Sequence, residues 1–461
     1  MTPHPRLGLS LVPGALRGFQ TFGVFGHFAR PFGERCTSRQ SIGHSSNRMS
    51  TTEGRLAMTD SPHADASAYP RPARIAAAAA FGLQGFLLAA ILTQLPQYQD
   101  RFGFDDTVIV VAVVTVSLVA GAGSVLAEHL ARRFSSKSAL RFGLATIAVA
   151  GGALGFSPNT AAFFACLSVY GAGLGMVDAA ANMQAVSIQH AYGRFILSSF
   201  HAVWSVGAIA GALFVAATSA LDVGVAAAQL TAALVVAVGL ALCGPRLLVR
   251  TEPNRTTPPT AGGAIVPLRA LLALGSAMAL FYAIDFSVGN WSALYLRNVL
   301  FADAGTAALA LAAYQCAALA SRLSGDFWVA KYGEIAVVRA GSAIGIAGMT
   351  IVALAQSPAI AIAGFLVVGL GVPVVAPLCF SAAGRLAPTG QVDDVVARIN
   401  LFNYVGTLVG GAIVGGVAAA TSLRIGFVVP LLFAVALLLL APAFAPDRDR
   451  DRRSEWAPER E

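Results

Sequence analysis

The chain has 461 residues, of which 56% are hydrophobic and only 12% are charged, and its mean hydropathy is +0.69. Soluble globular proteins carry about a quarter charged residues, so this composition excludes a single soluble core of this length and requires contact with lipid. The net charge of +8 does not indicate nucleic-acid binding, because the basic residues stand between apolar runs and in the tails, without a basic stripe interleaved with aromatic residues.

Residues 1–72 differ from the rest, because they are rich in Arg, Ser, Gly, His and Pro and contain no long apolar run. They show no signal-peptide pattern, so we expect a disordered cytoplasmic tail. An alternative is that the native protein starts at Met49 or Met58, which would leave up to residues 1–57 untranslated.

Twelve apolar runs follow, each close to the 20 or so residues that a helix needs to cross a bilayer. Backbone polar groups must be satisfied internally in lipid, so these runs predict helices rather than open strands. The expected spans are 75–96, 107–127, 138–156, 160–183, 195–219, 223–245, 268–290, 304–324, 335–356, 359–383, 397–421 and 424–445.

The basic residues predict the orientation of these spans. Of the 31 Lys and Arg residues, only Arg101, Arg297 and Arg424 fall on one side, and the tails and loops of the other side hold the rest. The positive-inside rule then places both termini in the cytoplasm, and we expect a multi-pass protein of a bacterial-type inner (plasma) membrane.

The sequence also predicts two halves. A polar, Pro- and Gly-containing segment lies at the midpoint, with six spans on either side. We therefore expect a tail at 1–72, a six-helix bundle at 73–246, a cytoplasmic linker at 247–267, a second six-helix bundle at 268–446 and a charged cytoplasmic tail at 447–461.

The two halves repeat at a shift of 198 residues. Glu128 and Arg133 between spans 2 and 3 fall on Asp326 and Lys331 between spans 8 and 9, and the same shift aligns Arg141 with Arg339. Because six spans return the chain to its starting side, the repeats are parallel, which implies two bundles related by an axis along the membrane normal.

These features resemble the major facilitator superfamily (MFS). In that family, a Gly, an acidic residue and basic residues in the loops after spans 2 and 8 lock adjacent helices in one conformation. The resemblance implies a gating role for Arg322, Gly325, Asp326, Lys331 and Arg339. It implies a weaker one for Glu128 and Arg133, whose loop has Ala127 and Ser135 where glycines are usual.

A narrower resemblance is to the YbjJ-like branch, which is loosely related to the fucose-permease-like transporters. It covers about residues 75–445. The stretches that carry it are Gly171-Ala-Gly-Leu-Gly175-Met-Val-Asp178, Ser198-Ser-Phe-His201-Ala-Val-Trp204-Ser205 and Asn290-Trp291-Ser-Ala-Leu-Tyr295. The branch often has an acidic residue where this chain has Asn290. The resemblance implies transport but no particular solute.

Asp178 is the most informative candidate site residue. It shares one face of span 4 with Asn182 and two glycines, and a carboxylate inside a membrane must face the bundle interior or a water-filled cavity. Two interpretations stay open: a proton-coupling or substrate site, or a hydrogen-bonded structural acid at the end of the span, paired with Arg194.

Four further groups of polar residues are candidates for the lining of a central site formed by spans 1, 4, 5, 7 and 11. Each also has a structural interpretation as a helix-packing or hydrogen-bonding group. For Asp285 this interpretation is an acid at a water-filled pore mouth, and Gly289-Asn290 suggests a local break in span 7. The candidates are His201 and Trp204; Asp285, Asn290 and Trp291; Asn400, Asn403 and Tyr404; and, more weakly, Gln84.

The predicted function is secondary active transport of a small polar solute by alternating access, coupled to protons through Asp178 or Asp285. We expect no enzyme activity, no cofactor and no metal site, since the chain has no nucleotide-binding loop and no HExxH motif. The expected partners are the solute, protons and the lipid bilayer, with no nucleic acid, and the chain is expected to be a monomer. The alternatives are a non-transporting receptor or sensor on the same fold, or a drug or metabolite efflux pump.

Overall fold

The computed structural model describes residues 71–104, 106–249, 266–388 and 390–445. The predicted tails and most of the predicted linker lie outside these residues. The first half consists of α1 (Arg71–Phe102), α2 (Asp106–Arg133), α3 (Ser136–Leu154), α4 (Thr160–Tyr192), α5 (Leu197–Ala220), α6 (Val225–Cys243) and the short 3-10 helix η1 (Gly244–Arg246).

The second half consists of α7 (Leu268–Asn298), α8 (Ala304–Tyr332), α9 (Glu334–Leu354), α10 (Pro358–Gly371), η2 (Val372–Val374), α11 (Val375–Leu386), α12 (Val392–Ala420), α13 (Leu423–Gly426), α14 (Val428–Leu440) and η3 (Ala441–Phe444). The tenth span is α10, η2 and α11 together, and the twelfth is α13 and α14. Every predicted span therefore corresponds to helix, and the fold is all-α with twelve transmembrane helices in two parallel six-helix bundles.

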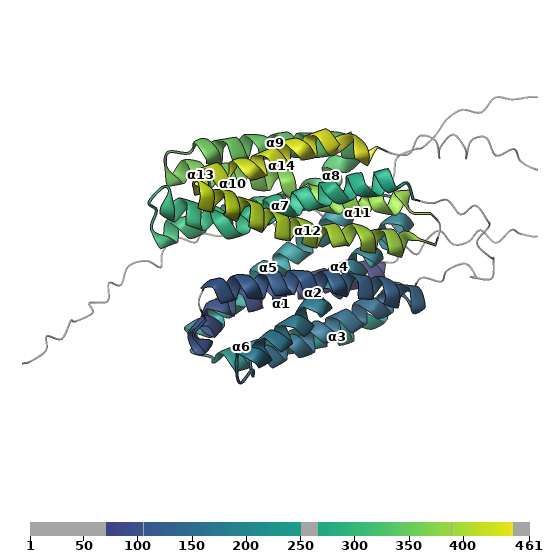
Figure 1. The fold of residues 1–461 in the computed structure, drawn as a ribbon. Coiled ribbons are helices and arrows are strands. Elements are labelled where there is room, and N and C mark those ends of the chain that lie inside the picture. Colours follow the sequence, from purple (N-terminus) through teal and green to yellow (C-terminus); the bar gives the residue numbers. More distant parts are fainter. Residues whose placement is uncertain (1–70, 105, 250–265, 389, 446–461) are drawn as a thin grey trace, which may run out of the picture. The chain divides into compact units, whose positions relative to one another are not determined.

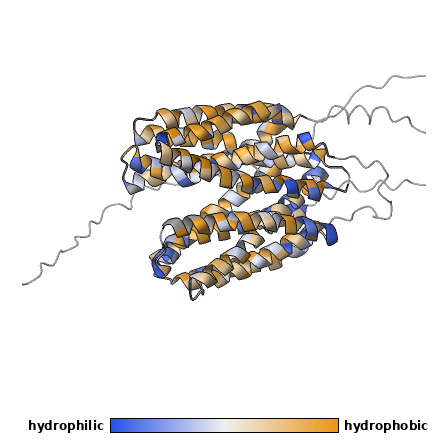
Figure 2. Cartoon of the chain, viewed as in Figure 1, coloured by the Kyte–Doolittle hydropathy of each residue, from blue (hydrophilic) through white to orange (hydrophobic). Residues whose placement is uncertain are grey.

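Ten stretches in the described residues are long and apolar enough to cross a membrane by themselves. The two remaining spans, α3 and α8, pack along helices of the same half, α3 against α4 and α6 and α8 against α7 and α10. Figure 2 shows hydrophobic residues along the helices and hydrophilic residues gathered near the helix ends, as expected for a lipid-facing protein.

Local sequence signals set several helix ends. Asn159 caps α4 by accepting a hydrogen bond from the backbone N–H of Ala162, and Gly193 ends the helix in the left-handed conformation with φ 61°. Helix α4 thus continues well beyond the predicted end at residue 183, which places Asp178 in the middle of the helix. In the tenth span, Pro373 lies in the 3-10 turn that interrupts the helix.

The predicted local break in span 7 is wrong, because α7 is continuous through Gly289 and Asn290. A single glycine weakens a helix by about 1 kcal/mol, which packing over 31 residues outweighs.

Small residues bring the helix pairs of each half close together. A Cβ atom on Gly207 of α5 would lie 2.0 Å from the carbonyl oxygen of Gly82 in α1. In the second half, a Cβ atom on Gly406 of α12 would lie 2.2 Å from the carbonyl oxygen of Ala279 in α7. Both halves therefore use the same close backbone approach of their first and fifth spans, which small residues permit in membranes.

The two halves contact each other through a defined subset of helices. In the first half these are α2, α4 and α5, and they meet α8, α11 and α12 of the second half (Figure 1). This arrangement leaves α1 and α7 beside the space between the halves, where the candidate site lies.

Candidate functional site

A cavity of about 290 Å³ lies between the two halves. All five helices that were predicted to line a central site contribute to it, namely α1, α4, α5, α7 and α12, and α2 and α8 contribute as well. Its polar and charged lining residues are Gln84, Ser117, Tyr170, Asp178, Asn182, His201, Trp204, Tyr282, Asp285, Gln315, Arg322, Asn400, Asn403, Tyr404 and Thr407.

Asp178 connects the two halves at this cavity. Gln84 Nε2 of α1 donates a hydrogen bond to Asp178 Oδ1, and the hydroxyl of Tyr404 in α12 donates to Asp178 Oδ2. Asp178 is therefore hydrogen-bonded within its own half and across to the other half. The suggested pairing with Arg194 does not form, because that guanidinium lies over the ring of Tyr192, 5.9 Å from its centroid.

The second intramembrane acid, Asp285, also lines the cavity and belongs to one half only. The hydroxyl of Tyr314 in α8 donates to Asp285 Oδ1 at 2.6 Å. The neighbouring predicted residues do not line the cavity: Asn290 is exposed and donates to the carbonyl of Phe286 at 2.8 Å, and the Trp291 ring packs against Gly415.

Three predicted asparagines and His201 line the cavity with distinct partners. Asn182 Nδ2 donates to the backbone carbonyl of Asp178 at 2.9 Å, and Asn400 Nδ2 donates to Ser124 Oγ of α2 at 2.7 Å. Asn403 is buried in the wall. The His201 ring stacks on Phe380 of α11 with 6.1 Å between centroids, and its Nε2 has no hydrogen-bond partner.

Arg322 lies in the cavity wall, although it was assigned to a gating loop. Its Nη1 donates to Ser205 Oγ of α5 at 2.7 Å, and its guanidinium lies 5.9 Å from the ring centroid of Trp204. The residue is only 6% exposed. Helix α8 extends to Tyr332, so Arg322 is well inside the helix rather than in the loop after it.

Other polar contacts join the halves at one end of the cavity. Asp326 of α8 accepts hydrogen bonds from the backbone N–H groups of Ser198 and Ser199 at the start of α5, each at 2.9 Å. Gly325 permits this approach, because a Cβ atom there would lie 2.7 Å from Ser198 Oγ. Gln189 of α4 donates to Ser381 Oγ of α11 at 2.7 Å.

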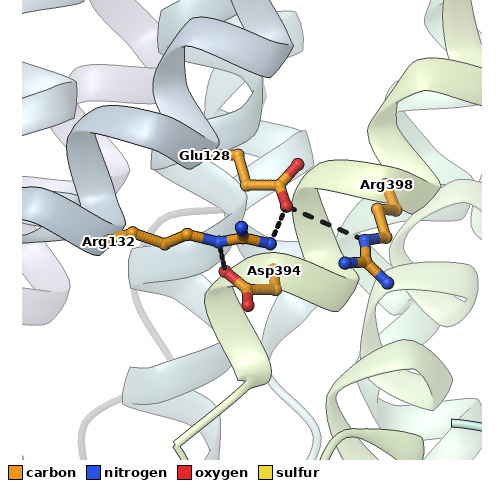
Figure 3. Close-up of polar contacts among 4 residues, drawn as sticks. All are labelled: Glu128, Arg132, Asp394 and Arg398. Carbon is orange, nitrogen blue, oxygen red and sulfur yellow. Dashed lines mark hydrogen bonds and ion pairs between the residues drawn. The ribbon is translucent and has the colours of Figure 1, made fainter. Parts of the chain in front are cut away.

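A charged cluster at the same end joins α2 to α12 (Figure 3). Arg132 is ion-paired with Glu128 of its own helix, and its Nε also donates to Asp394 Oδ1 at 2.7 Å. Arg398 Nε lies 3.7 Å from Glu128 Oε1. Glu128 thus contacts the second half through Arg398, and its basic partner on α2 is Arg132.

Among the other loop residues predicted to act in gating, none joins the two halves through a described contact. Arg133 lies over the ring of its neighbour Phe134, Lys331 lies near the rings of Phe327 and Tyr332, and Arg339 is exposed.

The two halves are joined at the end of the cavity formed by Glu128, Arg132, Asp394, Asp326 and the start of α5. We name this end the sealed end. The cavity extends away from it. Its α1 lining runs as far as Leu95, near the end of that helix, and its α2 and α4 linings reach Ala112 and Leu167, near the helix starts. The cavity therefore extends from the charged side chains toward the end opposite the sealed one.

The sequence reasoning missed the lining residues Ser117, Tyr170, Tyr282 and Gln315, and it missed Tyr314, the hydrogen-bond donor to Asp285. Their only signal was a polar atom within an apolar span, which is weak for a tyrosine because its ring also packs in cores.

Two helical halves around a polar cavity, joined at one end, define the architecture of a membrane carrier. The family model of the Major Facilitator Superfamily matches residues 51–212 and 274–460, which is more than half of the chain. The chain belongs to the Major Facilitator Superfamily. It is a multi-pass membrane transporter and not an enzyme.

Related proteins align with most of the chain. The chain is 31% identical over 371 residues to an uncharacterized MFS-type transporter of Yersinia pestis, an alignment covering 79% of this chain and 92% of that protein. It is 29% identical over 373 residues to the uncharacterized transporter y4wD of Sinorhizobium fredii, covering 79% and 96%. FucP, a fucose:proton symporter of E. coli, is similar in its outward conformation with a TM-score of 0.69 at 16% identity, covering 81% and 98%.

Proposed function

We propose that this chain is a secondary active transporter that moves a small polar solute by alternating access and couples this movement to protons through Asp178. The observation that carries the proposal is the position of Asp178 in the cavity, with hydrogen bonds from Gln84 in one half and Tyr404 in the other. A carboxylate at membrane depth is costly, and such groups serve in proton relays.

A proton on Asp178 would act on both halves through the hydrogen bonds of its carboxylate. An ionised carboxylate only accepts hydrogen bonds, and Asp178 accepts one on each oxygen. A protonated carboxyl carries its own O–H donor and is a weaker acceptor, because the charge-assisted bonds are lost. Protonation of Asp178 would therefore weaken the contact with Tyr404 across the halves and favour their movement.

Alternating access follows from the parallel repeat. The two halves would rock about the cavity, with the sealed end opening as the opposite end closes. Under the positive-inside rule the sealed end and both termini would face the cytoplasm, so the cavity would open to the outside. The similar FucP structure is also in an outward conformation. FucP is a fucose:proton symporter, which supports proton coupling here without indicating the solute.

The test uses purified protein in proteoliposomes with an acidic outer buffer. A small-metabolite extract of bacterial cells is added outside, and mass spectrometry identifies the compounds that accumulate inside relative to protein-free vesicles. We expect Asp178→Asn to abolish gradient-driven accumulation of these compounds, because an amide does not take up the proton in this pH range, while exchange across equal pH remains in part.

The matched control is Asp222→Asn. Asp222 is exposed, and its positive φ of 54° suits Asn, so the same chemical change is tolerated there. Accumulation by Asp178→Asn at the level of the control would reject Asp178 as the coupling residue. If no compound accumulates in any vesicles while one binds the protein, the chain is a receptor and the proposal of transport fails.

A further inference from the structure

Arg322 is a buried cation without an anionic partner. No carboxylate of the described residues forms an ion pair with it, and its Nε has no hydrogen-bond partner. Arg is charged at every physiological pH, and an uncompensated buried charge is strongly unfavourable. Arg322 also lines the cavity, so an anion that enters the cavity can reach it.

One edge of the Arg322 guanidinium makes no hydrogen bond among the described residues. Nη1 is occupied by Ser205 Oγ at 2.7 Å, and the Trp204 ring lies 5.9 Å away, centroid to guanidinium carbon. The opposite edge, formed by Nε and Nη2, makes no hydrogen bond to the part of the chain that the structure describes. Two parallel N–H groups on one edge match the two oxygens of a carboxylate.

The acids of the cavity are occupied by other groups. Asp178 accepts from Gln84 and Tyr404, one on each oxygen, and Asp285 accepts from Tyr314. Tyr282 also lines the cavity. Neither acid forms an ion pair with Arg322 among the described residues, so a carboxylate on the solute can form one.

We propose that the transported solute carries a carboxylate that binds the Nε and Nη2 edge of Arg322. This inference rests on the proposed function and names the substrate class of its site. The remaining polar lining, with Asn182, Asn403 and Gln315, supplies neutral donors and acceptors that suit hydroxyl groups. Asp285 disfavours a second negative charge on the solute, so the class is hydroxylated monocarboxylates.

One proton moving with one monocarboxylate transfers no net charge across the membrane. Uptake should therefore respond to a pH gradient and not to a membrane potential. A neutral solute moving with one proton would carry one positive charge, and an inside-negative potential would drive its uptake.

Arg322 also belongs to the contact between the halves, since Ser205 and Trp204 lie on α5 and Arg322 lies on α8. A carboxylate bound at Arg322 would thus sit where the two halves meet.

The experiment uses the same proteoliposomes and metabolite extract, supplemented with D-gluconate and D-glucuronate and their neutral counterparts sorbitol and D-glucose. Vesicles are given either a pH gradient alone or a potassium diffusion potential alone, and protein-free vesicles correct for passive entry of weak acids. The variants are Arg322→Gln, Arg322→Lys and, as the matched control, Arg297→Gln at an exposed arginine near the end of α7.

We expect the accumulating compounds to be monocarboxylates that respond to the pH gradient alone. A bidentate charged contact contributes enough that Arg322→Gln should raise KM for these compounds by about tenfold or more. Arg322→Lys should recover part of the loss, and Arg297→Gln should match the unmodified protein.

Accumulation of only neutral or cationic compounds would overturn the proposal while leaving proton-coupled transport intact. An Arg322→Gln variant that lowers kcat equally for all compounds, with KM unchanged, would also overturn it, because Arg322 would then act only in the contact between the halves. If nothing accumulates, the proposed function fails and this inference fails with it.

Discussion

Replacing Asp326 with Asn tests whether the sealed end holds the observed state. Asp326 of α8 accepts two backbone N–H groups at the start of α5, both at 2.9 Å, and its negative charge lies at the positive end of that helix. Hydrogen bonds to a charged group contribute about 1.5–3 kcal/mol, and a charge at a helix terminus adds about 0.3–1 kcal/mol. Asn retains one carbonyl acceptor and loses the charge.

From these contributions we expect Asp326→Asn to cost the observed state about 2–3 kcal/mol, which is a shift of about 30- to 150-fold toward opening of the sealed end. The assay is electron spin resonance distance measurement between labels at Phe134→Cys and Tyr332→Cys, with the five native cysteines replaced. Both positions are exposed, at 65% and 56%, and follow α2 and end α8. The population at longer distance should rise.

The control is Asp303→Asn at the other end of α8. Asp303 caps that helix by accepting from the backbone N–H of Thr306 at 3.0 Å, a role that Asn also fills. An unchanged distance distribution in Asp326→Asn, or the same change in the control, would refute the view that Asp326 holds the sealed end closed.

Three further predictions concern contacts between and within the halves. Tyr404→Phe should shift the same distance distribution about tenfold toward opening of the sealed end, because it removes a hydrogen bond to Asp178 across the two halves. Gln84→Leu should leave the distribution unchanged, because the hydrogen bond of Gln84 to Asp178 lies within one half. Equal shifts in the two variants would contradict this prediction. Arg132→Gln should shift the distribution only about twofold, since this side chain is 48% exposed. The shift should vanish in 1 M salt, because salt screens exposed ion pairs. A shift that remains in 1 M salt would contradict this prediction. Gly207→Val should lower the free energy of unfolding of the purified protein by about 1–3 kcal/mol, because its side chain clashes with the α1 backbone. Gly289→Ala meets open space, so it should leave the free energy of unfolding unchanged or raise it. A Gly207→Val variant as stable as the unmodified protein would show that α1 and α5 are not tightly packed.

The spans could be predicted because lipid imposes length and hydrophobicity on every helix. Their ends could not, since a helix continues into water as long as its capping signals allow. Helix α4 ends at Tyr192 and α8 at Tyr332, beyond the predicted ends at residues 183 and 324. Arg322 lies within the predicted span 304–324, and only the family resemblance assigned it to a gating loop.

The sequence indicated several residues of the candidate site but not the hydrogen bonds between them. Asp178 stood out because an intramembrane acid is rare. Its partners are 94 and 226 residues away in the sequence, and helical periodicity shows only which residues share a face. The contact of Asp178 with Tyr404 therefore needed the packing of the two halves. For the same reason the sequence indicated Arg133, whereas its neighbour Arg132 forms the ion pair with Asp394.

The most direct test of proton-coupled transport is the pH inside the proteoliposomes. A pH-sensitive dye is enclosed at equal pH on both sides, and a compound that accumulates with the unmodified protein is added outside. The account predicts that the lumen acidifies as this compound enters, and that the Asp178→Asn vesicles exchange the compound without acidification. Entry of the compound without any change in lumenal pH in the unmodified protein would contradict the account.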